Sequence, residues 1–435
     1  MPPIPTTNHT ILDHLTRVAA GRWSARQAVE EALSRCDTLE GELHAWVHLD
    51  RAGALEQADR LDAAKSRGEA IGPLFGVPVA VKDLFDLSGW PTGCGSRLLE
   101  SGPPAARSAP LVARLQAAGA VVLGKTVTTQ FACFDPPRTR NPWNVDRTPG
   151  GSSSGSAVAV ATGMCLAALG SQTGGSITRP ASFCGIAGLK PSFDRLPIEG
   201  VYPVASSLDH PGPMARTVAD LQLLNRVLSL SSQTPEWDPL QTQSKPPRTI
   251  GVLRGMFQEK AEGDCWDVFE RTLAKLRGAG ADVRECRLPT QFDTVIATHR
   301  AVMITEIASH HESRLAAHPD DYLPGMRSLI EEGIRARGVD YVRAKSHQAA
   351  LKAALRDCFD EFDLLACPAT RGGAPTRETT GDPSFNAPWS YTGLPTVTLP
   401  MGVDSAGMPL GLQLVGKRDG DADLLSMGVW CENSC

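Results

Sequence analysis

The sequence lacks the features that mark proteins of nucleic acids and membranes. Its 435 residues include 43 Lys and Arg against 48 Asp and Glu, which gives a net charge of −5 without a long run of one sign. No basic patch for nucleic acid or an anionic membrane surface is visible. No run of about 18 apolar residues occurs either. We therefore expect neither a nucleic-acid partner nor a membrane-spanning segment.

Cysteine is present, but not in a pattern that carries chemistry. The eleven cysteines are scattered, none forms a Cys-x-x-Cys pair, and none has a histidine at metal-ligand spacing. This excludes a disulfide framework and a zinc site, and we expect no metal and no organic cofactor. Residues 1–15 lack the basic start and continuous apolar segment of a signal peptide, so we expect a cytoplasmic protein.

The hydrophobic content of 42%, with 41 Gly and 33 Pro, is typical of a large globular protein with many turns. Ser24 and Gln27 form a capping box before an amphipathic helix, and alternating valines over 77–81 predict a buried strand that ends at Lys82. A helix closed by Gly119, followed by a strand over 120–126, indicates a parallel βαβ step.

Later segments are less specific. The passage 196–213 is rich in proline and is predicted to be a loop, and the polar stretch 231–247 is the best candidate linker. The region 265–366 is mostly helical in pattern. The end of the chain, 394–416, has the alternation and turn of a strand pair.

A glycine-serine loop over 148–163, TPGGSSSGSAVAVATG, allows three interpretations. It lacks the Gly-Lys-Ser/Thr ending of a phosphate loop. It matches the Gly-x-Ser-x-Gly nucleophile elbow with Ser153 at the centre, but no later histidine has a convincing context for an elbow's base. The third interpretation, a flexible loop, leaves a second cluster of the same kind unexplained.

That second cluster, GSQTGGSITRPAS over 170–182, places Gly174 and Gly175 before Ser176. Consecutive small residues let backbone N–H groups converge on one point, as an oxyanion hole requires. Ser176 would then be a nucleophile. No histidine lies between His48 and His210, so the best candidate base is Lys82, because burial in apolar surroundings disfavours the ammonium form.

These residues carry a resemblance to the amidase signature family. It extends over about residues 20–425 through VPVAVKDLFD, TRNPWNVDRTPGGSSSGSAVAVATG, GSQTGGSITRPASFCGIAGLKPSFDRLP, SLDHPGPMARTVAD and GLPTVTLPMG with GMPLGLQLVG. The resemblance implies a Ser-Ser-Lys triad with nucleophile Ser176, base Lys82 and bridging Ser152, the last in a cis peptide bond. It also implies an oxyanion hole from the backbone N–H groups near Thr173, Gly174, Gly175 and Ser176.

The fold implied is α/β: an α/β/α sandwich with a large mixed, mostly parallel sheet. We expect a single domain over 1–435. Its parts would be a helical part over 1–70, a signature core over 71–230, a helical insert over 255–365 and C-terminal strands over 366–435.

The sequence departs from the common family pattern GTDTGGSIRxPA near the nucleophile. Gln172 takes the Asp position, Thr178 takes the Arg position, and the arginine follows as Arg179. Arg179 could contact a substrate carboxylate or brace the loop through backbone carbonyls. Leu84 and Ser390 also replace residues frequent in the family, away from the proposed proton path.

The substrate pocket is expected to form around 128–137, TTQFACFDPP, with Phe131 at the family's pocket-lining position and Cys133 and Phe134 close by. This apolar set favours a small neutral aryl or alkyl acyl group over an anionic one. We therefore expect hydrolysis of small-molecule amides or anilides, with carbamates (urethanes) as an extension, by a protein that could be a homodimer.

Three alternatives stay open at this point. The first is the glutaminase subunit of a tRNA-dependent amidotransferase, which shares the signature and would need protein partners. The second is an esterase of the Gly-x-Ser-x-Gly type that uses Ser153. The third is a non-catalytic binding protein on an amidase fold, which is disfavoured because all three triad positions are filled.

Overall fold

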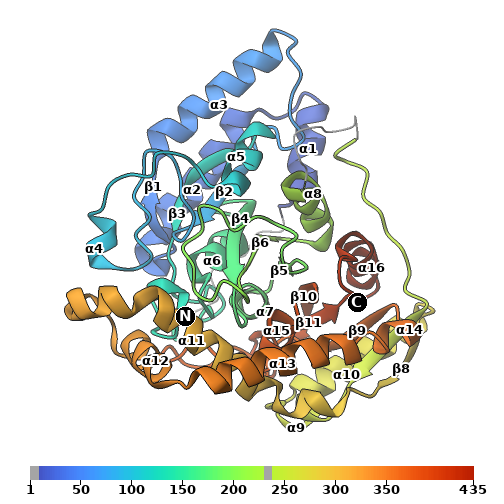
Figure 1. Cartoon of the computed structure of the whole chain (residues 1–435). Coiled ribbons are helices and arrows are strands. Elements are labelled where there is room, and N and C mark those ends of the chain that lie inside the picture. Colours follow the sequence, from blue (N-terminus) through green and yellow to red (C-terminus); the bar gives the residue numbers. More distant parts are fainter. Residues whose placement is uncertain (1–8, 230–237) are drawn as a thin grey trace.

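The computed structural model describes residues 9–229 and 238–435, and its centre is one sheet of 11 strands (Figure 1). Across the sheet the order is β1-β3-β2-β4-β6-β5-β10-β11-β9-β7-β8. The strands are Trp46–Leu49 (β1), Pro78–Lys82 (β2), Val121–Thr126 (β3), Ala167–Gln172 (β4), Ala187–Lys190 (β5), His210–Ala215 (β6), Thr249–Leu253 (β7), Asp282–Cys286 (β8), Leu364–Pro368 (β9), Thr396–Val403 (β10) and Pro409–Val415 (β11).

Helices connect most of these strands and surround the sheet (Figure 1). The α-helices are Ile11–Ala19 (α1), Ala25–Leu43 (α2), Arg51–Ser66 (α3), Arg97–Glu100 (α4), Pro110–Ala117 (α5), Ser154–Thr162 (α6), Thr178–Cys184 (α7), Val218–Ser229 (α8), Met256–Glu259 (α9), Cys265–Gly278 (α10), Val295–Ala317 (α11), Pro324–Arg335 (α12), Gly338–Ala354 (α13), Cys358–Glu361 (α14), Ala387–Thr392 (α15) and Asp421–Ser434 (α16). Short 3-10 turns lie at Gln130–Ala132, Thr290–Thr294 and Pro319–Asp321.

Successive residues of β2 show that helices cover both faces of the sheet. Val79 and Val81 join one apolar cluster, which includes residues of α8 and α16. Ala80, which points to the opposite face, joins a second cluster with residues of α2 and α6. Because both faces are apolar and covered, the strand reads as a continuous hydrophobic run. The predicted α/β class with helices on both sides of a mixed sheet is confirmed.

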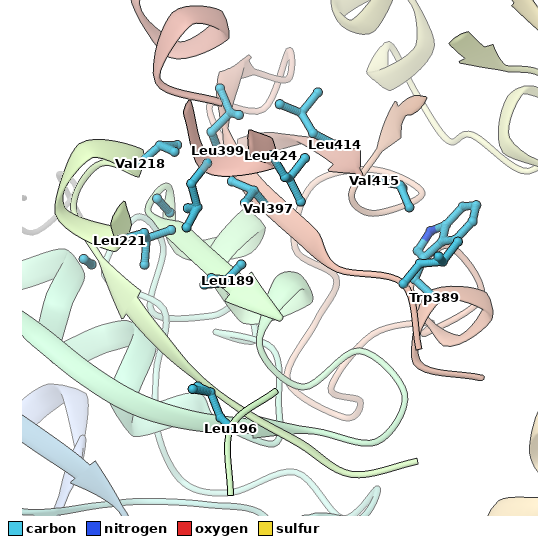
Figure 2. Packing of buried hydrophobic residues seen from close by; sticks show 14 of the residues in the cluster. Leu189, Leu196, Val218, Leu221, Trp389, Val397, Leu399, Leu414, Val415 and Leu424 are labelled. Carbon is cyan, nitrogen blue, oxygen red and sulfur yellow. The ribbon is translucent and has the colours of Figure 1, made fainter. Parts of the chain in front are cut away.

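One part of the first cluster lies where the C-terminal strands meet two helices. Figure 2 shows Val218 and Leu221 of α8 near Val397 and Leu399 of β10, with Leu424 of α16 beside them. All five side chains are fully buried. The contact joins segments from the middle and the end of the chain, so the C-terminal strands complete a core that the middle of the chain begins.

The prediction that the sheet is mostly parallel is wrong in that detail. Among the described strands, four neighbouring pairs are parallel and six are antiparallel. Five of the antiparallel pairs involve β5, β6, β10 or β11, which occupy the middle of the sheet, and the sixth joins β1 to β3 at one edge. Such antiparallel pairings need no crossover helix, so the βαβ signal used in the prediction does not reveal them.

The proline-rich passage predicted as a loop ends in a strand. Strand β6 contains Pro211 and Pro213, and proline normally argues against a central strand. The two prolines are spaced by two residues, so their missing N–H donors face the same neighbour. Strand β4 pairs with all of β6, whereas β5 pairs only with Met214 and Ala215. The prolines are tolerated because the ladder between β5 and β6 ends at Met214, so neither proline is paired with β5.

Other local predictions are confirmed. Helix α2 begins after Ser24 with the predicted capping box to Gln27, β2 ends at Lys82, and β10 pairs with β11 as a hairpin. The helical region 265–366 also contains β8. Of the predicted linker, 231–237 lies outside the described residues, and 238–247 has no helix or strand. Among residues 9–229 and 238–435, no helix has both the length and the apolarity to cross a membrane.

Candidate active site

Lys82, the last residue of β2, is fully buried and contacts two serines. Its Nζ lies 2.8 Å from Ser152 Oγ and 2.9 Å from Ser171 Oγ, with the Ser171 carbonyl oxygen at 3.4 Å. Burial lowers the pKa of Lys82 from 10.5 to about 7, although the charge of Asp209 opposes this. An amine with this pKa is substantially neutral at pH 7 and can accept a proton.

Ser152 lies in the glycine-serine loop that leads into α6. The peptide bond between Gly151 and Ser152 is cis, as the resemblance implies. Gly150 has a positive φ of 80°, and a side chain there would meet Pro180 of α7, so this position needs glycine. The loop is thus pressed against the helix that follows the predicted nucleophile.

The predicted nucleophile Ser176 lies in the turn between β4 and α7. Gln172, at the end of β4, holds this turn, because its Oε1 accepts hydrogen bonds from the backbone N–H groups of Ile177 and Thr178 at 2.9 and 3.0 Å. The Thr173 hydroxyl donates to the Asp209 carboxylate at 2.6 Å. Burial raises the pKa of Asp209 to about 6, and the hydrogen bonds that it accepts oppose this. Each end of the turn is therefore fixed by a buried side chain.

Residues of α15 and of the loop before it pack on the other side of this turn. The Ser390 hydroxyl donates to the Gly174 carbonyl at 3.1 Å. Asn386 donates through Nδ2 to the Ala369 carbonyl and to Gln413 Oε1, which leaves its Oδ1 facing Gly175. A Cβ on Gly175 would lie only 2.6 Å from that oxygen, so the turn accepts no side chain there.

A cavity of about 310 Å³ opens beside the turn. Its walls come from the loop after β3, the glycine-serine loop, the nucleophile turn, α11 and the segment before α15. Most of the sequence-predicted site residues line it: Cys133, Phe134, Ser152, Thr173, Gly174, Gly175, Ser176 and Arg179. Lys82 lies behind Ser152, within hydrogen-bonding distance of it. The structure thus brings the predicted triad residues to one place.

Phe131 is the exception, and the prediction that it lines the substrate pocket is wrong. Its side chain is fully buried outside the cavity, where its ring contacts those of Tyr202, His311 and Tyr322. The residue has a positive φ of 47°, and this turn of the backbone directs the ring into the core. The cavity is therefore less aromatic than the sequence predicts. Of the two phenylalanines predicted to line it, Phe134 does so and Phe131 does not.

Arg179, on α7, is only 5% exposed, yet it is incompletely bonded. One guanidinium nitrogen donates to the Gly151 carbonyl at 2.7 Å and to the Thr380 hydroxyl at 3.3 Å. Its Nε and Nη1 have no partner within the described residues. Burial lowers the pKa of Arg179 to about 10, and only the charge of Asp382 opposes this. The guanidinium therefore braces the loop with one nitrogen and leaves buried donors unused.

The family model described as Amidase matches residues 27–425 of this chain. The chain belongs to the amidase signature family. A glutamyl-tRNA(Gln) amidotransferase subunit of Cyanothece sp. (strain PCC 7425 / ATCC 29141) is 33% identical over 445 residues, which cover 90% of this chain and 91% of that protein. Many further curated relatives match this member of the amidase signature family, and the amidotransferase subunits among them are of similar identity.

Solved structures resemble this amidase signature protein along nearly its whole length. A chain from a vestigial protein complex, described in connection with the evolutionary origins of an s-triazine catabolic enzyme, has a TM-score of 0.91 and 31% identity, covering 98% of both chains. A crystal structure of an amidase has a TM-score of 0.88 and 33% identity, covering 98% of this chain and 99% of that one.

The departures from the common family pattern are accommodated within the site. Gln172 caps the nucleophile turn and reaches Ser390 through its Nε2 at 3.3 Å, while the Thr178 hydroxyl donates to Gln172 Oε1. Where the common family pattern has an Asp and an Arg, this protein therefore has Gln172 and Thr178, joined by hydrogen bonds between neutral groups. Leu84 is fully buried in the core.

Sequence reasoning missed three residues of the site. Ser171 contacts Lys82 and lies in the same sequence motif as Ser176. Its strand is parallel to the strand that carries Lys82. The position of Ser171 in that motif was therefore a signal that it could belong to the site. Asp209 lies in the motif SLDHPGP, but nothing in its local context distinguishes it. His299 comes from α11, in the region without specific motifs, and reaches the Thr173 carbonyl at 2.9 Å.

Ser153 does not support the esterase alternative. Its hydroxyl is fully buried, lies 3.4 Å from the backbone carbonyl and N–H of Ser171, and does not line the cavity. No histidine of the described chain bonds to it. The nucleophile elbow needs an exposed serine with a base beside it, and this geometry provides neither.

Proposed function

We propose that this protein hydrolyses the C–N bond of small amides through an acyl-enzyme on Ser176. The observation that carries the proposal is the Lys82 amine, fully buried and 2.8 Å from Ser152 Oγ, behind a cavity that both serines line. A lysine with a pKa of about 7 is a suitable general base at neutral pH.

The residues have distinct roles in the proposed reaction. Ser176 Oγ attacks the amide carbonyl and passes its proton to Ser152, whose own proton moves to neutral Lys82. The backbone N–H groups at Thr173, Gly174, Gly175 and Ser176 stabilise the oxyanion. The proton returns through Ser152 to the leaving amine, and water then cleaves the ester bond to release the acid.

We further propose that the substrate carries a carboxylate near Arg179. The preference for neutral aryl or alkyl groups depends on two premises: that Phe131 lines the pocket and that backbone carbonyls use Arg179 fully. Phe131 lies outside the cavity, and two nitrogens of Arg179 lack partners among the described residues. A buried cation without a counter-charge is costly, and a substrate carboxylate would relieve that cost. Cleavage of carbamates stays a separate prediction.

The amide-donating subunit of an amidotransferase is the second candidate. The curated relatives favour it, since amidotransferase subunits of this kind are 33% and 34% identical over 90% and 95% of the chain. Arg179 and Asp382 both line the cavity, so in this candidate Arg179 would meet the carboxylate of free glutamine and Asp382 its ammonium group. This candidate predicts that activity depends on partner subunits.

A substrate panel on the purified chain tests these proposals. It comprises malonamic acid, L-glutamine, benzamide, 4-nitroacetanilide and phenyl carbamate, each with Ser176→Ala and Ser153→Ala as the matched pair. We expect Ser176→Ala to abolish turnover and Ser153→Ala to lose far less. If Ser153→Ala abolishes turnover and Ser176→Ala stays active, the assignment of Ser176 as the residue that forms the acyl-enzyme is overturned.

Arg179→Gln tests the carboxylate. Glutamine keeps a donor for the Gly151 carbonyl but removes the charge, so we expect the KM of malonamic acid to rise at least about tenfold, the loss of one charge-assisted contact, with benzamide unchanged. An equal effect on both substrates would reject the carboxylate. Glutamine cleavage only after addition of partner subunits would favour the second candidate.

A further inference from the structure

His299 is a titratable residue of the cavity wall to which the proposed mechanism gives no role. It lies on α11, in the helical region of the chain, and its side chain is 4% exposed. It lines the same cavity as Ser152 and Ser176. If Gly174, two residues before the nucleophile, carried a Cβ, that atom would lie 3.7 Å from His299 Cε1. The imidazole is thus next to the nucleophile turn.

The hydrogen bond of His299 fixes which nitrogen carries the proton. Its Nε2 lies 2.9 Å from the Thr173 carbonyl oxygen. A carbonyl oxygen can only accept, so Nε2 must be the donor. Burial lowers the pKa of His299, which favours the neutral ring. In the neutral ring with a protonated Nε2, Nδ1 carries a lone pair and is an acceptor.

Within the described residues, the His299 ring forms its hydrogen bond through Nε2, and Nδ1 forms none. The cavity wall holds donors, such as the backbone N–H groups of the nucleophile turn and the guanidinium groups of Arg179 and Arg300. It also holds the Asp382 carboxylate, whose two oxygens already accept from Arg371 and from the Ser384 N–H. Hydroxyl groups in the wall can donate or accept, whereas this nitrogen can only accept. An amide substrate needs acceptors for its own N–H groups.

The proton path gives a reason for placing such an acceptor here. In the proposed reaction, Ser152 donates a proton to the lone pair of the leaving nitrogen, so the N–H groups of that nitrogen point away from Ser152. A neutral acceptor beside the nucleophile turn would hold the nitrogen in that orientation. Substituting both N–H groups by methyl groups would leave Nδ1 unpaired.

We propose that His299 is a specificity-determining residue whose Nδ1 accepts a hydrogen bond from an N–H group of the scissile amide. The inference rests on the proposed amide hydrolysis and names the substrate class within it: primary and secondary amides are preferred over N,N-dialkyl amides. The helical region, which carries no family motif in the sequence, thereby contributes to substrate choice.

The test uses the primary amide that the wild-type protein cleaves best in the panel of malonamic acid, L-glutamine and benzamide, together with its N,N-dimethyl counterpart. In His299→Gln, the side-chain amide can still donate to the Thr173 carbonyl but has no acceptor in the place of Nδ1. His299→Asn keeps a polar atom near the position of Nδ1 and loses the bond to Thr173. His310→Gln is the matched control, because His310 lies on the same helix, is exposed and contacts Ser206.

We expect His299→Gln to lower kcat/KM for the primary amide by about tenfold, as the loss of one hydrogen bond implies, and to leave the dimethyl amide within about twofold. The ratio between the two substrates then falls, while His310→Gln leaves it unchanged. Labelling of Ser176 by diisopropyl fluorophosphate, which has no amide N–H, should proceed at the wild-type rate in His299→Gln.

Two results would overturn the inference, and they are distinguishable. If wild-type protein cleaves amides but His299→Gln slows both substrates and the labelling equally, His299 only holds the Thr173 carbonyl. If wild-type protein cleaves no amide of the panel, the proposed function fails and the inference fails with it. A ratio that falls in His299→Gln and is retained in His299→Asn supports the acceptor role.

Discussion

At the scale of single residues, the contacts of Lys82 decide which way its lone pair points. A neutral amine has two N–H donors and one lone pair. The carbonyl and the hydroxyl of Ser171 lie 3.4 and 2.9 Å from Nζ and can accept both donors. The lone pair is then directed at Ser152, 2.8 Å away. Ser171 is therefore a positioning residue for the proposed base.

The first residue-scale prediction concerns pH. Because the pKa of Lys82 is lowered to about 7, kcat/KM should rise with pH through about 7 and level off above it as the amine loses its proton. Lys82→Arg keeps a cation that cannot act as a base, so activity should fall by at least about 10²-fold. A pH profile of both proteins checks this. Substantial activity in the arginine variant would exclude lysine as the base.

At the scale of elements, the turn between β4 and α7 is shaped by packing from α15 and the segment before it. Two adjacent glycines in this turn have different surroundings. A Cβ on Gly175 would lie 2.6 Å from Asn386 Oδ1, and Asn386 is itself fixed by Ala369 and Gln413. A Cβ on Gly174 would have no neighbour closer than 3.7 Å.

This difference gives an element-scale prediction. Gly175→Ala should displace the turn, with a loss of about 1–3 kcal/mol of stability and of most labelling of Ser176 by a fluorophosphonate. Gly174→Ala, the matched control, should keep the wild-type melting temperature within a few degrees. Differential scanning calorimetry and labelling rates measure both. Equal melting temperatures for the two variants would mean that Asn386 does not restrict the turn.

At the scale of the whole molecule, two buried lysines make stability depend on pH. Besides Lys82, Lys190 at the end of β5 is fully buried, and its Nζ donates to the Pro191 carbonyl at 2.9 Å. Burial lowers the pKa of Lys190 from 10.5 to about 7, although the charge of Asp421 opposes this. At pH values between about 7, the pKa of Lys190 in the folded protein, and 10.5, its ordinary pKa, the unfolded chain binds a proton that the folded protein does not.

The free energy of unfolding should therefore rise as pH increases from about 7 to about 8. Nearer pH 9, buried thiols such as those of Cys133 and Cys184 oppose this rise, because burial raises their pKa and the unfolded chain loses their protons first. Lys190→Met removes one of the two groups, so we expect a higher stability at pH 7 and a smaller rise with pH. Urea denaturation at several pH values measures this. Lys260→Met, at an exposed site, is the control and should follow the wild-type slope. An unchanged slope in Lys190→Met would mean that Lys190 does not contribute.

The sequence by itself determined the local elements of this protein and the positions that we propose for its triad. The cap at Ser24, the strand that ends at Lys82 and the two glycine-serine clusters are patterns within a few residues of chain, and such patterns are readable without tertiary contacts. The motif order also identified the family. These features depend on backbone propensity and on residue type, which the sequence carries directly.

Only the tertiary structure decided how the cavity is lined. Phe131 turns into the core because its backbone has a positive φ, and His299 reaches Thr173 across 126 positions of the chain. The prolines of β6 are tolerated because the pairing of β6 with β5 stops at Met214. These outcomes depend on which distant segments meet, and the sequence around each residue holds no record of its neighbours in space. The substrate specificity we propose therefore rests on contacts that no local pattern could predict.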